Sequence, residues 1–126
     1  MTHAKSFRDL EVYKLARELA REIFQLTINF PKEETYSLTD QIRRSSRSVG
    51  GQIAEAWAKR RYEKHFISKL TDADGEQQET QHWLETAFDC EYINTQTLKD
   101  FINRYDSVGK MISSMINKSN LFCKEK

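Results

Sequence analysis

Apolar residues recur every three to four positions along four long segments of the chain, a spacing that places them on one face of an α-helix. In the first segment Leu15, Leu19 and Ile23 follow this spacing, while Arg17 and Arg21 lie between them. The pattern predicts helices over residues 8–29, 37–60, 62–92 and 95–118. No segment shows the strict alternation of a half-buried strand, so the pattern predicts an all-α protein.

The ends of the predicted helices are marked by residues that stop or cap helices. Pro31 cannot continue the first helix. We expect Thr35 or Ser37 to cap the second helix, and Asn94 or Thr95 to cap the fourth. No proline separates the second helix from the third, but the apolar phase restarts there and places a turn near residues 60–62.

Four long helices joined by short turns predict an antiparallel up-down-up-down four-helix bundle. The 126 residues form one domain, 1–126, and a chain of this length buries roughly two thirds of its unfolded surface. The residues after Lys118 lie beyond the last apolar positions and are expected to fray.

The second helix has two unusual faces. One is the predicted core, formed by Leu38, Ile42, Ser45, Ser46, Val49, Ile53, Ala56 and Trp57. The other carries small residues, although each glycine inside a helix costs about 1 kcal/mol relative to alanine. Either the small residues ease packing inside the monomer, or a second subunit packs on them. The candidate interface residues are Arg43, Arg47, Gly50, Gly51, Ala54, Ala58, Glu55 and Glu79.

The formal net charge of +1 conceals a strong asymmetry along the chain. Residues 43–64 carry seven basic and two acidic side chains, whereas residues 72–91 carry seven acidic side chains and no Lys or Arg. A basic face that meets the acidic face of a neighbouring copy forms a heterologous contact, which closes as a ring. Clustered cations also bind nucleic-acid phosphates, through Arg43, Arg44, Arg47, Lys59, Arg60, Arg61 and Lys64. Both interpretations stay open at this stage.

Little in the sequence points to catalysis. Glu79 and His82 form one E-x-x-H, whereas a di-iron bundle needs two such motifs and two further glutamates. No nucleophile motif and no glycine-rich phosphate loop after a strand are present. We therefore expect no catalytic residues, no metal site, no cofactor and no small-molecule substrate, and we expect the chain not to be an enzyme. A metal-dependent bundle enzyme is the third and weakest alternative.

The composition and the first residues predict a cytoplasmic protein. Hydrophobic residues make up 38% of the chain and charged residues 31%, which is typical of a soluble helical protein. No apolar run has the roughly 18 residues of a membrane span, and the first ten residues lack the apolar segment of a signal peptide, so no membrane partner is expected. Cys90 and Cys123 have no motif spacing and are expected to be free thiols.

Three stretches carry a family resemblance: FRDLEVYKLARELA, FPKEETYSLTDQIRRSSRSVGGQIAEA and ADGEQQETQHWLETAFDCEYI. In order and spacing they resemble the four-helix-bundle proteins encoded by intervening sequences in bacterial 23S rRNA genes. The similarity runs from Phe7 to about Ile116. Three positions depart from the family's pattern: Gln52 replaces the usual asparagine, Ala56 a glycine and Glu76 a serine. Any specific contact of that asparagine is therefore altered here.

The resemblance implies a non-enzymatic protein and a mode of assembly. A related bundle, the accessory variability protein of diversity-generating retroelements, forms a pentameric ring with basic surfaces and works with a reverse transcriptase and RNA. By this resemblance we expect a homo-oligomer, a pentamer, that acts as an adaptor on structured RNA or on DNA. The alternative is an oligomeric protein–protein scaffold that binds no nucleic acid.

Overall fold

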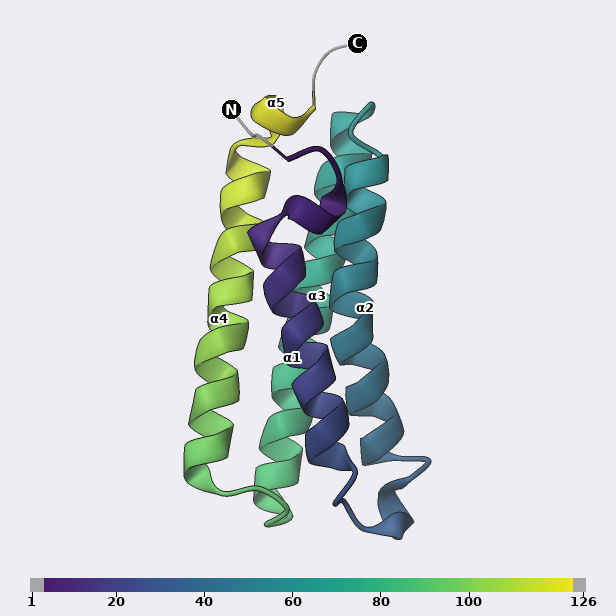
Figure 1. Ribbon diagram of the computed structural model, residues 1–126, viewed down its shortest axis with the longest axis vertical. Coiled ribbons are helices and arrows are strands. Elements are labelled where there is room, and N and C mark those ends of the chain that lie inside the picture. The colour runs from purple at the N-terminus through teal and green to yellow at the C-terminus, as the bar shows by residue number, and fades with distance from the viewer. Residues whose placement is uncertain (1–3, 124–126) are drawn as a thin grey trace.

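The structure, a computed structural model, describes residues 4–123 and shows the predicted antiparallel bundle (Figure 1). Four long helices run up and down along one axis: α1 (Glu11–Thr27), α2 (Leu38–Ala58), α3 (Glu63–Asp89) and α4 (Thr95–Asn117). Short elements flank them: the 3-10 helices η1 (Phe7–Asp9) and η2 (Lys32–Glu34), and α5 (Ser119–Phe122). The all-α, up-down-up-down prediction is confirmed.

Most predicted boundaries lie within about three residues of those observed. The α2–α3 turn falls at residues 59–62, as predicted. Asn94 caps α4, because its side-chain oxygen accepts a hydrogen bond from the backbone N–H of Thr97 at 2.8 Å.

The cap predicted for α2 is wrong. Ser37 occupies the N-cap position, but its side chain makes no capping bond. The carboxylate of Glu34 accepts from the backbone N–H of Leu38 at 3.3 Å instead. The prediction for the residues after Lys118 is also wrong up to Cys123. They form α5, whose Phe122 ring stacks on Phe66 with the ring centroids 5.8 Å apart. Residues 124–126 lie outside the described residues.

The core lies along the bundle axis and includes every α2 residue predicted to face it. Its centre contains a polar contact between α2 and α3, in which the hydroxyl groups of Ser45 and Thr80 lie 2.8 Å apart. Thr80 also donates to the backbone carbonyl of Glu76, so this buried pair is satisfied.

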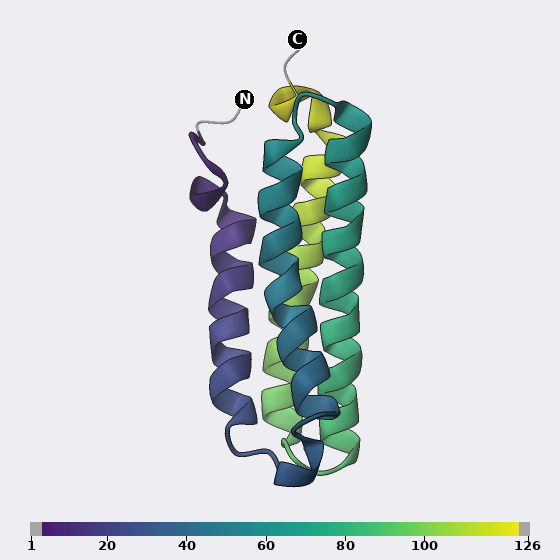
Figure 2. The ribbon, with the colours of Figure 1, turned by 90° about the vertical axis from the view of Figure 1, so that its right-hand side faces the viewer.

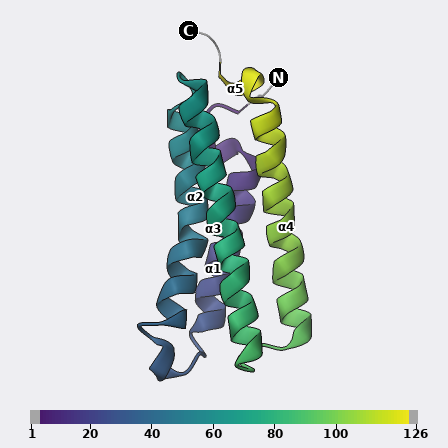
Figure 3. The ribbon, with the colours of Figure 1, turned by 180° about the vertical axis from the view of Figure 1, so that it is seen from behind.

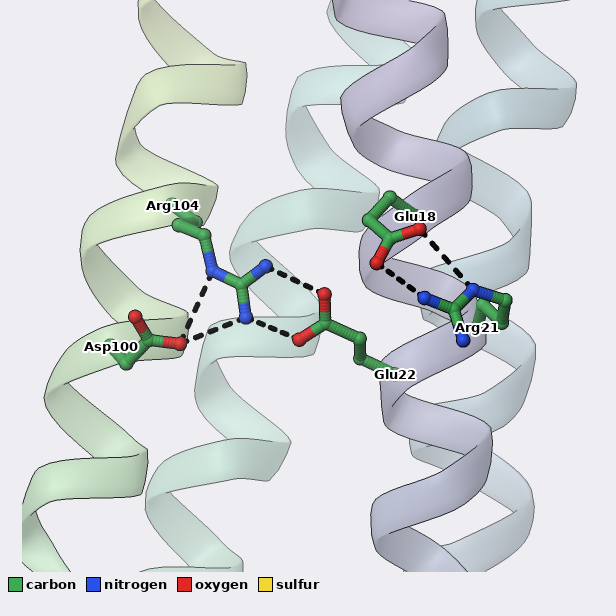
Figure 4. Close-up of polar contacts among 5 residues, drawn as sticks. All are labelled: Glu18, Arg21, Glu22, Asp100 and Arg104. Carbon is green, nitrogen blue, oxygen red and sulfur yellow. Dashed lines mark hydrogen bonds and ion pairs between the residues drawn. The ribbon is translucent and has the colours of Figure 1, made fainter.

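The helix α1 lies on one side of the bundle, where it packs against α2 and α4 (Figures 2 and 3). Its main polar link to α4 joins Glu22 to the guanidinium of Arg104, which donates to both carboxylate oxygens and also to Asp100 (Figure 4). The bonds from Arg104 hold the pKa of Glu22 below its usual value. Glu18 and Arg21 form a second pair on the exposed face of α1.

Across residues 4–123, none of the helices has the length and apolar character needed to cross a membrane.

Candidate nucleic-acid interface

The seven basic residues predicted as one cluster form two separate groups. Arg43, Arg44 and Arg47 lie in the first half of α2, and we call them the mid-helix arginines. The other four follow the end of α2, with Lys59, Arg60 and Arg61 in the turn and Lys64 in the first turn of α3, and we call them the turn cluster. Arg43 and Lys59 are 16 residues apart, which corresponds to about 24 Å along a helix axis. One phosphate group cannot contact both groups.

Arg44 is engaged with α3 of the same protomer. Its guanidinium donates to the carboxylate of Glu79 at 2.6 Å and lies 3.5 Å from that of Glu76. The indole N–H of Trp83 also donates to Glu79, and this bond, together with the charge of Arg44, holds the pKa of Glu79 below its usual value. The hydrogen bond to Glu79 in turn raises the pKa of Arg44. This pair therefore joins α2 to α3 within the protomer.

Arg43 and Arg47 are directed toward α1. The guanidinium of Arg43 donates to the hydroxyl of Thr27 at 2.7 Å and lies 4.5 Å from the centre of the Phe24 ring. The guanidinium of Arg47 lies 5.7 Å from the centre of the same ring. These distances fit cation–π contacts, so both side chains help to hold α1 on α2.

The turn cluster is arranged differently. Among residues 4–123, none of its four cations forms an ion pair. Lys59, Arg61 and Lys64 are exposed. Arg60 is half-buried, because its guanidinium lies 3.7 Å from the centre of the Trp57 ring and its Nε donates to the Trp57 carbonyl. Trp57 itself is 8% exposed, which confirms that it belongs to the core.

The nearest acidic residue in sequence, Glu63, forms no ion pair with the turn cluster among residues 4–123. Its carboxylate accepts a hydrogen bond from the hydroxyl of Ser119 on α5 and offsets one of the four positive charges nearby. Lys118, the residue between α4 and α5, adds a further exposed cation at the same end of the bundle (Figure 1). Sequence reasoning missed Lys118, because only the fold brings it to the end that holds the α2–α3 turn.

The two ends of the bundle carry opposite charge. The end with the α2–α3 turn and α5 holds the turn cluster and Lys118. The opposite end holds η2 and the α3–α4 turn, where the charged side chains are Lys32, Glu33, Glu34, Asp89 and Glu91. An anion such as a phosphate is therefore attracted to one end only.

The small-residue face of α2 is partly covered by α1. Gly50 is buried, and a Cβ at that position would lie 3.5 Å from the Tyr13 ring, an ordinary packing distance. A Cβ on Gly51 would meet nothing within 4 Å, and Ala58 is also exposed. Gly50 therefore packs inside the protomer, whereas Gly51 and Ala58 remain accessible to a partner. Ala54 is half-buried and lines a groove of about 280 Å³ between α1 and α2, with Arg17 and Arg47 also in its lining.

Glu55, the remaining candidate interface residue, is exposed but bonded within the protomer. Its carboxylate lies 3.0 Å from the ammonium of Lys69 on α3. Sequence reasoning missed Lys69, because the phase of α3 relative to α2 is set by the packing of the two helices.

The two residues of the E-x-x-H motif, Glu79 and His82, contact other side chains of the bundle. Glu79 binds Arg44 and Trp83, and the imidazole of His82 lies 4.7 Å from the Trp83 ring, measured between ring centres. Across residues 4–123, no group of three or more His, Cys, Asp or Glu side chains is placed to hold a metal ion.

Comparison with known proteins gives the family. The family described as 23S rRNA-intervening sequence protein matches residues 8–114, which is most of the chain. This chain belongs to that family. A solved structure supports the assignment: a protein of unknown function from the S23 ribosomal protein family of Bacteroides thetaiotaomicron is 29% identical, with a TM-score of 0.74. The alignment covers 84% of this chain and 95% of the other. A comparison with curated proteins found no match.

The three positions at which the resemblance to the 23S rRNA-intervening sequence protein family implies other residues fall at different depths in this structure. Ala56 is fully buried in the core, so the methyl group fills space between helices. Glu76 is half-buried beside Arg44. Gln52 is half-buried, and its side-chain oxygen lies 3.4 Å from the ammonium of Lys69. Two of the three departures therefore contribute polar contacts between α2 and α3.

Proposed function

We propose that this protein is a non-enzymatic homo-oligomer that binds the phosphate backbone of nucleic acid, structured RNA in particular, through the turn cluster. The observation that supports it most is the contrast between the two groups of basic residues. The mid-helix arginines contact neighbouring helices, whereas the turn cluster has no carboxylate partner among residues 4–123. Unpaired, exposed cations at one end of a bundle attract an anionic polymer and release its counterions on binding.

The binding step is electrostatic and does not require sequence readout. Lys59, Arg61 and Lys64 can each approach a phosphate, and the free N–H groups of Arg60 can do so from its position above Trp57. A homo-oligomer repeats this end several times, so modest contacts in each subunit add through effective concentration. The acidic end repels the same polymer, which orients the bundle on it.

Assembly would use the open part of the α1–α2 face. Gly51 and Ala58 leave room for close approach, and Phe24 on α1 is 37% exposed and Ile28 is 56% exposed. Arg17 and Arg47 give this face positive charge, and the exposed residues Glu85 and Asp89 of α3 give the complementary charge on another face. Contact between two different faces is heterologous, and it closes as a ring when the rotations between successive subunits add up to a full turn. Five subunits is the number that the retroelement resemblance implies.

The binding proposal is tested by anisotropy of a labelled structured RNA and a duplex DNA over about 50–200 mM salt. We expect a steep fall of affinity with salt for the wild type. Changing Lys59, Arg61 and Lys64 together to Gln should flatten the slope of log K against log[salt] by about 2 or more. The matched control changes Arg43 and Arg44 to Gln and should leave the slope unchanged, whereas Arg47 is kept because it lies on the proposed assembly face. Equal slopes for this double variant and for the turn-cluster variant would contradict the assignment to the turn cluster.

The assembly proposal is tested by light scattering, with 14.9 kDa as the mass of one chain. The wild type should give a multiple of this mass, five for a pentamer. Gly51→Trp places a large ring where the protomer itself has open space, so it should lower the mass while helicity is kept. Gly51→Ala is the control and should keep the assembly. An unchanged mass for Gly51→Trp would exclude this face.

A protein–protein scaffold is the second candidate, and the engaged mid-helix arginines favour it. Their contacts with Glu79, Thr27 and Phe24 show basic residues serving helix packing in this chain. In that case the wild type would bind neither RNA nor DNA at the lowest salt, yet would still assemble.

A further inference from the structure

Tyr62 lies in the middle of the turn cluster with its ring directed to solvent. It is the N-cap residue of α3, and its extended backbone (φ −122°, ψ 104°) precedes the helix. The side chain is 58% exposed, although an aromatic ring of this size gains free energy when it is buried. Tyr62 therefore contributes little to the core and is available at the surface.

The surroundings of Tyr62 differ from those of the other exposed tyrosine. The guanidinium of Arg61 lies 5.9 Å from the centre of the Tyr62 ring, and the His65 ring lies 5.6 Å away at an interplanar angle of 50°. Tyr36 is 93% exposed, but it follows Glu33 and Glu34 at the acidic end. Exposure is common to both rings, whereas only Tyr62 combines it with unpaired cations.

An exposed ring beside phosphate-binding cations fits a nucleic-acid strand with unpaired bases. The cations hold the backbone, and the face of the ring stacks on a base that is free of its own partner. In a duplex both faces of each internal base are covered by neighbouring bases, so a ring at the end of a bundle gains no stacking there. His65 and Arg61 can contact the same base, because both lie close to the Tyr62 ring, at 5.6 Å and 5.9 Å from its centre.

We infer that the Tyr62 ring is a base-stacking platform, and that the turn cluster therefore prefers unpaired nucleotides, such as a loop or a single strand, over duplex. This inference rests on the proposed nucleic-acid binding and adds the class of substrate. RNA and DNA single strands share the backbone charge and the exposed base faces, and separate arms of the test distinguish them.

The test measures binding of the full chain to a labelled 12-nucleotide single strand and to the matching 12-base-pair duplex, each as RNA and as DNA. Tyr62→Ala should weaken single-strand binding about 5- to 150-fold, the range that corresponds to loss of one stacked base. Duplex binding should stay within about twofold. The salt slope on the single strand should be unchanged, because no charge is removed. Tyr62→Phe should retain single-strand affinity, because the ring is kept.

Tyr36→Ala is the matched control, because it removes a more exposed tyrosine ring that lies at the acidic end, and it should leave all affinities unchanged. A similar loss for Tyr62→Ala on single strand and duplex, or no loss on either, would overturn the stacking role. A changed oligomer mass for Tyr62→Ala would overturn it as well, because the ring would then be a subunit contact. Absence of salt-dependent binding by the wild type to any probe would instead overturn the proposed function itself.

Discussion

The two groups of basic residues have the same chemistry and opposite surroundings. The mid-helix arginines face α1 and α3, where they find Thr27, Phe24 and Glu79. The turn cluster extends beyond the packed part of the helix and meets no carboxylate among residues 4–123. A cation in the middle of a bundle helix therefore contributes to helix packing, whereas a cation at its end remains available for a partner.

The largest expected effect is a difference in the free energy of unfolding between variants of the two groups of basic residues. Changing Arg43, Arg44 and Arg47 together to Gln removes two partly exposed ion pairs, two cation–π contacts and a charged hydrogen bond. It should lower the free energy of unfolding by about 1–2 kcal/mol in total. The triple Gln variant of the turn cluster should change it by no more than about 0.5 kcal/mol. Urea denaturation of both variants measures the difference. Equal losses of unfolding free energy would contradict the view that only the mid-helix arginines contribute to helix packing.

Arg104 of α4, which forms an ion pair with Glu22 of α1, extends the comparison. Glu22→Gln removes the charge that Arg104 of α4 contacts and should cost about 1 kcal/mol at pH 7, because both side chains are about 30% exposed (31% and 29%). The folded state lowers the pKa of Glu22, so its contribution is present above the ordinary Glu pKa of about 4.3 and is lost as the pH falls. Wild type and variant should therefore converge below about pH 4 in chemical denaturation. A gap independent of pH would show that the charge is irrelevant.

The smallest expected effect concerns Arg60, the member of the turn cluster that packs on the core residue Trp57. Arg60→Lys keeps the charge but loses the flat stack on Trp57 and the bond from Nε to its carbonyl. Unfolding free energy should fall by roughly 0.5 kcal/mol, while the salt slope of nucleic-acid binding stays the same. A flatter slope would place Arg60 among the residues that need bidentate contact with phosphate.

Sequence periodicity was sufficient for the fold, because each long helix carries a clear apolar face and the turns are short. It also identified the α2 core correctly, down to Ser45 and Ser46. The α2 cap was missed because Glu34 reaches it from η2, and only the folded backbone brings that carboxylate to Leu38. The short helix α5 was missed although Leu121 and Phe122 were visible as apolar residues after the break.

The candidate site was harder to predict, for two physical reasons. A helical wheel shows the direction of a side chain but not its distance along the axis, so seven cations that span about 24 Å or more were treated as one cluster. The wheel also does not show what faces each direction, which depends on how α1 and α3 are rotated against α2. Gly50 and Gly51 show the same limit of the helical wheel, since Tyr13 covers Gly50 and does not cover Gly51.

The link between Glu22 and Arg104 bears on the order in which the chain folds. Consecutive helices are neighbours in the bundle, so most contacts form between segments that are close in sequence, which favours rapid folding. Glu22 and Arg104 are 82 residues apart, and α1 and α4 meet only after the whole chain has turned back. Closing that loop carries the largest entropy cost of any pairing of long helices in the bundle. We therefore expect the boundary between α1 and α4 to form last during folding, and its amides to exchange with solvent ahead of those buried between α2 and α3.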